Sequence, residues 1–217
     1  AACCAGFALY TYEQSDPKLY AVLAAAGLTR ETGLLLVAAW CIWLAAGRQW
    51  RCTAIFATAA IPAICWLLFV RAHTPEHEFE TVSFALFAGL LRRLLHPFPY
   101  LFGGPVRTVA IALDFLALAG IVAALLWAFS RALARAWSPV AIALYLFALL
   151  SITLSAPVAW DEVYAFGRSL TPLVLLAAAD GLSVNSMIPG FAMFAIDPRI
   201  GLQMGGQLLH VLRGLFP

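Results

Sequence analysis

Long apolar runs, interrupted by only one or two charged residues at a time, limit most what this chain can fold into. The sharpest case is the sequence Arg30-Glu31-Thr32-Gly33, which separates an apolar run at residues 19–28 from another at residues 34–46. Charges at membrane depth are costly, are commonly paired and mark functional sites. We therefore predict an integral membrane protein in which each charged residue needs its own explanation.

The overall composition supports this class. Hydrophobic residues make up 64% of the chain and charged residues only 11%, whereas ordinary soluble domains carry about 25% charged residues. The net charge of +2 and the lack of a basic run give no reason to expect nucleic acid as a partner. The expected partner is the lipid bilayer.

The apolar runs predict an all-α, polytopic transmembrane helix bundle that forms a single domain over residues 1–217, with about five full spans, because a spanning helix needs about 20 apolar residues. The expected spans are residues 32–47, 52–70, 106–129, 139–156 and 170–182, the last extended back through 164–168. Residues 19–28 read as a half-helix. The chain opens inside an apolar stretch without an initiator methionine, so we expect a fragment that lacks its natural N-terminus.

The long connection at residues 71–105 is predicted to contain an interfacial helix near residues 75–96. Thr74-Pro75-Glu76 is typical of a helix start, and Arg92, Arg93 and His96 lie where a helix end favours cations. Its uncharged stretch, residues 81–91, is short for a membrane crossing. A spanning helix is the alternative, and it would invert the orientation of every later segment.

Short arginine-containing loops predict the orientation. Arg48 and Arg51 lie in one loop and Arg131 and Arg135 in another, and we expect both on the inside. Residues 71–105 and 157–168 then lie outside.

Metal-binding motifs are weak. His73-Thr74-Pro75-Glu76-His77 matches the H-x-x-E-H pattern of some zinc peptidases, but Pro75 interrupts the helical face that would carry both histidines. The five cysteines include no C-x-x-C pair and read as small buried residues. We expect no metal and no cofactor.

Five charged residues remain as candidates for a site. Arg30 and Glu31 either mark a stop between two helices or bind a phosphate or sugar, since an arginine fork suits phosphate. Asp114 lies deep in an apolar run and, seven residues after Arg107, shares a helix face with it. This pair either makes an interhelical contact or serves a proton or ligand. Arg168 either reaches the lipid headgroups or faces an anionic lipid-linked substrate.

Two of these segments resemble bacterial membrane glycosyltransferases of the GT-C type. Leu28-Thr29-Arg30-Glu31-Thr32 is similar to their "L-T-[KR]-x-[TG]" break between two helices, and Arg168 precedes Pro172 at the start of a late span as in many of them. The resemblance implies a multi-pass protein of the bacterial inner membrane that takes a sugar from a polyprenyl-phosphate carrier on the outer face. Arg30, Glu31 and Arg168 would then bind substrate.

The resemblance assigns catalysis to an aspartate in an early external loop, and no residue here corresponds to it. We therefore expect this chain to be the later, non-catalytic portion of such an enzyme and name no catalytic residue. A small-molecule or lipid transporter or flippase, in which Asp114 would serve, and a non-enzymatic membrane scaffold are the alternatives.

The predicted orientation is testable by cysteine labelling in intact cells. In a background without native cysteines, Glu78→Cys and Asp161→Cys should react with a membrane-impermeant thiol reagent, and Arg131→Cys should not, because the arginine loops are retained inside. Labelling of Arg131→Cys alone would show that the topology is inverted.

Overall fold

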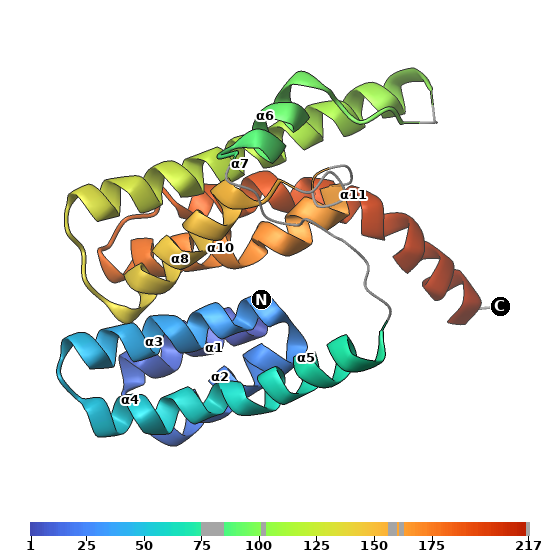
Figure 1. Cartoon of the computed structure of the whole chain (residues 1–217). Helices are drawn as coiled ribbons and strands as arrows, with labels where there is room; N and C mark the ends of the chain where they lie inside the picture. Colours follow the sequence, from blue (N-terminus) through green and yellow to red (C-terminus); the bar gives the residue numbers. More distant parts are fainter. Residues whose placement is uncertain (75–84, 101–102, 156–159, 161–162, 216–217) are drawn as a thin grey trace.

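The computed structural model describes residues 1–74, 85–100, 103–155, 160 and 163–215. All the secondary-structure elements assigned within these ranges are helices (Figure 1). In chain order the elements are α1 (Ala2–Glu13), α2 (Asp16–Thr29), the 3-10 turn η1 (Glu31–Gly33), α3 (Leu34–Ala46), α4 (Trp50–Ala57), the 3-10 turn η2 (Thr58–Ala60), α5 (Ile61–His73), α6 (Ala88–Leu95), α7 (Gly104–Leu133), α8 (Pro139–Thr153), α10 (Val163–Ser183) and α11 (Gly190–Leu215). The predicted all-α class is confirmed for the part of the chain that these ranges cover.

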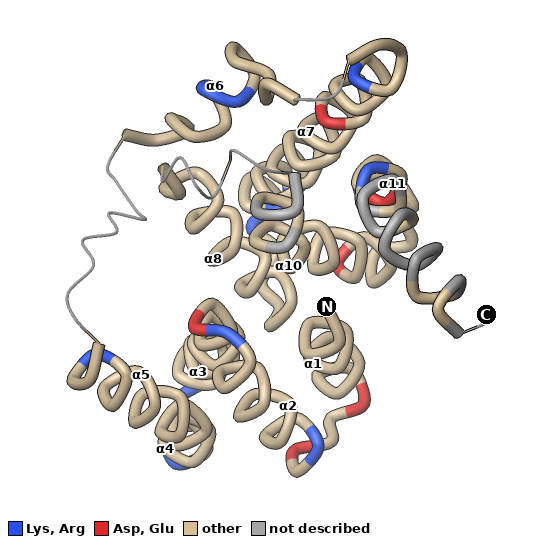
Figure 2. The backbone as a smooth tube through the Cα atoms, turned by 90° about the vertical axis from the view of Figure 1, so that its right-hand side faces the viewer, with Lys and Arg blue, Asp and Glu red and all other residues tan. Residues whose placement is uncertain are grey.

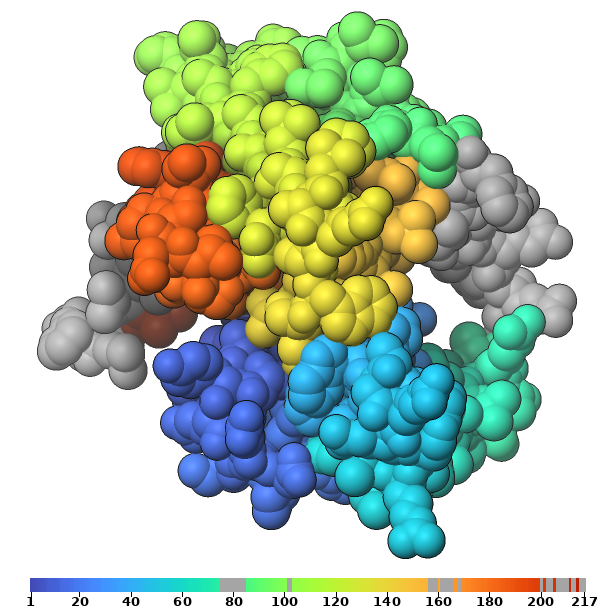
Figure 3. All heavy atoms as spheres, turned by 90° about the vertical axis from the view of Figure 1, so that its left-hand side faces the viewer, coloured from blue at the N-terminus to red at the C-terminus, as the bar shows by residue number. Residues whose placement is uncertain are grey.

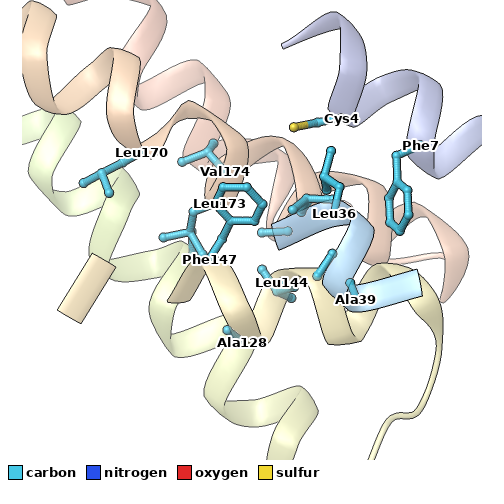
Figure 4. Close-up of a cluster of buried hydrophobic side chains, with 14 of the residues drawn as sticks. Cys4, Phe7, Leu36, Ala39, Ala128, Leu144, Phe147, Leu170, Leu173 and Val174 are labelled. Carbon is cyan, nitrogen blue, oxygen red and sulfur yellow. The ribbon is translucent and has the colours of Figure 1, made fainter. Parts of the chain in front are cut away.

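The helices form two groups that meet along one apolar seam. Helices α1 to α5 lie below α7, α8, α10 and α11 in Figure 1, and the two groups touch through α3 against α8 and α1 against α10. In the space-filling view the first group meets the second beneath α8 (Figure 3). Figure 4 shows the seam itself, with Phe7 and Leu36 from the first group near Leu144, Phe147 and Leu173 from the second. One continuous core therefore joins both groups.

Two helical stretches are long and apolar enough to cross a membrane by length and composition. They are residues Trp50–His73, made of α4, η2 and α5, and helix α7 with its 30 residues. The other predicted spans correspond to shorter apolar helices, Glu31–Ala46, Pro139–Thr153 and Ser169–Ser183. With 15 residues, α8 measures about 22 Å at about 1.5 Å per residue, less than the roughly 30 Å of a hydrocarbon core. Five full spans are therefore not confirmed.

The outer faces of the two long stretches are apolar and uncovered. On α5, Trp66, Leu68 and Phe69 are 57%, 63% and 55% exposed, and Phe129 on α7 is 63% exposed. Figure 2 shows that few of the positions along the backbone are lysine, arginine, aspartate or glutamate. Contiguous apolar surface of this kind marks a protein or membrane contact rather than a water-facing side.

The predicted helix near residues 75–96 is only partly correct. Residues 75–84, with His77, lie outside the described residues, and α6 begins at Ala88 because Phe87 adopts a left-handed backbone conformation with φ of 61°. Leu86, inside the predicted helix, therefore lies in a turn. The predicted end is accurate, since α6 stops at Leu95.

The two arginine-containing connections lie at the same end of the molecule, which is compatible with the predicted orientation (Figure 1). Arg48 follows α3 and Arg135 follows α7. Figure 1 places the α3–α4 and α7–α8 connections at the same end of the molecule, on the left. Helix α11, for which the sequence analysis offers no prediction, packs along α7 and brings a further arginine, Arg199, into the interior.

Close packing of α11 on α7 depends on a glycine. A Cβ atom on Gly120 would lie 2.8 Å from the carbonyl oxygen of Ala192 and 2.9 Å from the Cβ of Ala195. Gly120→Ala should therefore lower the free energy of unfolding by about 1–3 kcal/mol, the usual cost of overpacking, measured by thermal unfolding in detergent.

The matched control is Gly201→Ala on α11, where a Cβ would meet no atom within 4 Å. This variant should be neutral or gain up to about 1 kcal/mol from helix propensity. Equal unfolding midpoints for the two variants would contradict the close-packing account.

Candidate functional site

The break at Arg30-Glu31-Thr32-Gly33 is a tight reversal between α2 and α3. Arg30 is extended, with φ of −164° and ψ of 139°, and η1 follows it directly. A Cβ on Gly33 would lie only 2.0 Å from the carbonyl oxygen of Ala26, so the close approach of η1 to the end of α2 needs a glycine. The reversal fixes where the Arg30 side chain leaves the backbone.

Arg30 contacts the start of α10. Its Nη2 donates a hydrogen bond to Ser169 Oγ at 2.9 Å, across 139 residues of sequence. Arg168 belongs to the first turns of the same helix, which runs back to Val163 as predicted, and its side chain lies outside the described residues. The two segments that carry the family resemblance are thus neighbours in space.

A cavity of about 800 Å³ opens at this junction. Arg30, Glu31, Thr32 and Thr171 supply polar groups on its wall. The rest of the wall is largely apolar, formed by Ala1, Ala2, Cys3, Cys4, Ala26, Gly27, Leu28, Thr29, Gly33, Leu36, Ala63, Trp66, Leu67, Val70, Phe147 and Pro172. We call this the Arg30 cavity. Glu31 is exposed and Arg30 half-buried, so the polar groups are accessible to a ligand that enters.

Asp114 makes an interhelical polar contact, which is one of the two alternatives given for it above, and its arginine partners come from α6 and α11. Its carboxylate accepts hydrogen bonds from Arg93 Nη2 at 2.8 Å, from Arg199 Nε at 2.7 Å and from the Tyr100 hydroxyl at 2.7 Å. Arg199 Nη2 also donates to the Tyr100 oxygen at 2.7 Å. Arg107 is exposed on α7. Helices α6 and α11 cover Asp114 and supply its two arginine partners.

This arginine–aspartate cluster is nearly sealed from solvent. The side chains of Arg93, Asp114 and Arg199 are 4%, 5% and 7% exposed. Burial and the hydrogen bond to Asp114 raise the pKa of Tyr100 above its ordinary value, so its hydroxyl stays protonated at neutral pH and continues to donate. The cluster therefore joins α6, α7, α11 and the segment before α7 through charge-assisted bonds, which are stronger than neutral ones.

A second buried carboxylate, that of Asp180 on α10, was not among the candidate site residues predicted from the sequence. It is fully buried and accepts from Arg131 Nε at 2.7 Å and from Trp127 Nε1 at 3.0 Å. The signal was present, since Asp180 is a lone acid in an apolar run just as Asp114 is. Arg131, interpreted only as a loop charge, also anchors α7 to α10.

Of the histidines and the glutamate in the H-x-x-E-H motif, the described residues include only the first histidine, His73. His73 is the last residue of α5, and its Nδ1 lies 2.8 Å from the carbonyl oxygen of Phe69. Within the described ranges, no three His, Cys, Asp or Glu side chains come together as metal ligands would.

Comparison with known proteins adds no relative. No family model, curated protein or solved structure matches this chain.

The arginine–aspartate cluster yields a stability prediction. Asp114→Asn leaves two buried arginines without their counter-charge, and should cost about 3–5 kcal/mol of unfolding free energy, the usual penalty for breaking a buried ion pair. Asp197→Asn is the control, because Asp197 is exposed on α11 and should change stability by less than about 0.5 kcal/mol. Thermal unfolding in detergent measures both, and an Asp114→Asn variant as stable as the control would refute the account.

Proposed function

We propose that the Arg30 cavity binds an anionic, lipid-linked substrate, and that the chain is the donor-binding portion of a GT-C-like membrane glycosyltransferase. The substrate class is a sugar carried on polyprenyl phosphate. The observation that carries the proposal is the hydrogen bond from Arg30 to Ser169 at the edge of the 800 Å³ cavity. It brings together the two short motifs that the resemblance links to one substrate.

The lining of the cavity suits an amphiphile. Trp66, Leu67 and Val70 from α5 and Phe147 from α8 offer apolar walls for a hydrocarbon chain. Arg30 offers a planar set of N–H donors that matches phosphate oxygens, which lysine cannot reproduce. Glu31 and Thr171 lie on the same wall and can accept hydrogen bonds from sugar hydroxyls.

The uncovered apolar surfaces of α5 and α7 support the location that we propose. A multi-pass arrangement in a bacterial inner membrane would cover the exposed side chains of α5 and α7 with lipid, and would hold both arginine connections on the inner side. The Arg30 cavity would then open toward the outer half of the bilayer, where polyprenyl-phosphate sugars are used by GT-C enzymes.

In the proposed reaction this chain would bind the donor, and the catalytic base would lie outside this sequence. In an inverting transfer a base removes the proton of the acceptor hydroxyl, the hydroxyl oxygen bonds to the sugar carbon, and the carrier phosphate leaves with its electron pair. The resemblance places that base outside this sequence. Arg30, with Arg168 on the neighbouring helix, would stabilise the phosphate as negative charge develops on it.

Conservative arginine substitutions test the proposal. Arg30→Lys and Arg168→Lys should leave the amount of protein in the membrane unchanged. Each should weaken use of the polyprenyl-phosphate donor by about 1–3 kcal/mol, the scale of a charge-assisted hydrogen bond. The measurements are sugar transfer by the intact enzyme and binding of polyprenyl phosphate compared with polyprenol.

Arg71→Lys serves as the control, because Arg71 is exposed at the end of α5 and does not line the cavity. Unchanged transfer and binding in Arg30→Lys and Arg168→Lys at equal protein levels would rule out the substrate role. Movement of the lipid-linked sugar across the membrane without cleavage would favour the transporter instead.

A further inference from the structure

The arginine–aspartate cluster carries more positive than negative charge. Two arginines, Arg93 and Arg199, share the single carboxylate of Asp114, and all three side chains are at least nine-tenths buried. Tyr100 is neutral at physiological pH and adds no negative charge. A buried charge without compensation costs several kcal/mol, so the described residues leave this cluster one negative charge short.

A second cavity, of about 280 Å³, lies against the cluster. We call it the α6 pocket, and its lining consists of Arg92, Arg93, His96, Pro97, Phe98, Pro99 and Trp160. Arg92 and His96 are exposed and Arg93 is buried. Basic side chains therefore line the pocket both at its mouth and in the interior of the protein. None of these lining residues carries a carboxylate, and the pocket shares no residue with the Arg30 cavity.

Arg93 connects the cluster to the pocket. Among contacts within the described residues, only its Nη2 has a hydrogen-bond partner, Asp114. An arginine has five N–H donors, and this side chain also lines the α6 pocket. The Phe98 ring lies 5.5 Å from the Arg93 guanidinium carbon, in the range of a cation–π contact. The side chain is thus oriented before any ligand arrives.

Trp160, another lining residue of the pocket, is also held by its neighbours. Trp160 is 2% exposed, and its Nε1 donates to the carbonyl oxygen of Leu154 at 2.8 Å. A Cβ on Gly89 would overlap this indole nitrogen, so the glycine lets α6 lie directly on Trp160. The α6 pocket therefore has an aromatic side and a cationic side, and each is held by contacts with its neighbours.

We propose that the α6 pocket binds a phosphate group, which supplies the negative charge that the cluster lacks. Phosphate suits it because Arg92 and Arg93 offer planar donor sets at adjacent positions, and its volume is at the small end for ligand pockets. Leu91 and Leu95 on the same helix are 53% and 74% exposed, so a lipid headgroup with its acyl chains beside α6 is the source that the surface favours. This site is independent of the Arg30 cavity.

Lipid titration of the purified, delipidated full-length chain tests this site. Native mass spectrometry should detect one phosphatidylglycerol bound at least about tenfold more tightly than phosphatidylcholine, whose choline offsets its phosphate. Arg92→Gln combined with His96→Gln should remove about tenfold of that affinity. Arg71→Gln, which changes an exposed arginine outside both cavities, should leave the affinity unchanged.

A competition with inorganic phosphate separates the two sources. Displacement of phosphatidylglycerol by millimolar phosphate would assign the pocket to free phosphate groups, and no displacement would assign it to the lipid. The proposal is overturned if neither anion binds above phosphatidylcholine, or if Arg71→Gln weakens binding as much as the pocket variant. Arg93→Gln provides a second test, since it removes the excess charge and should abolish the preference while Arg199 still neutralises Asp114.

Discussion

The carboxylate of Asp114 is the contact on which the second half of the molecule depends. It is the common acceptor for Arg93, Tyr100 and Arg199, which come from three separate segments. Contacts between apolar helices do little to fix the rotation of each helix about its axis, because leucine and alanine side chains pack equally well at many rotations. A buried charge cluster permits only one arrangement of α6, α7 and α11, and the contact at Gly120 then becomes possible.

The first half of the molecule is held differently. Helices α1 to α5 are short, and the described charges near them, such as Lys18 and Glu13 at 4.0 Å, lie at the surface. Their arrangement depends on close backbone approach, most clearly at Gly33 beside Ala26, and on the shared core with α8 and α10. The hydrogen bond from Arg30 to Ser169 is a polar link across that seam, and the Arg30 cavity lies beside it.

Apolar run length predicted much of the fold and little of the ion pairing. Helices α7, α8 and α10 lie where the runs indicated, because a helix in an apolar environment must satisfy its backbone internally along the whole run. The start of α6 was not predictable, since the left-handed conformation of Phe87 has no local sequence signal. Arg199 lies 85 residues after Asp114, and no helical spacing relates two residues so far apart in the sequence. Arg30 and Arg168 were linked only by the family resemblance.

The order in which the Asp114 partners occur along the chain has a consequence for biosynthesis. Arg93 precedes Asp114 by 21 residues, and chains are made from the N-terminus onward. Helix α7 therefore enters its environment with a counter-ion for its acid already made, as a neutral pair. The second arginine, Arg199, is made 85 residues after Asp114, so α11 adds the excess positive charge to an ion pair that already exists. The packing of α11 onto α7 and the gain of positive charge by the cluster are thus one event.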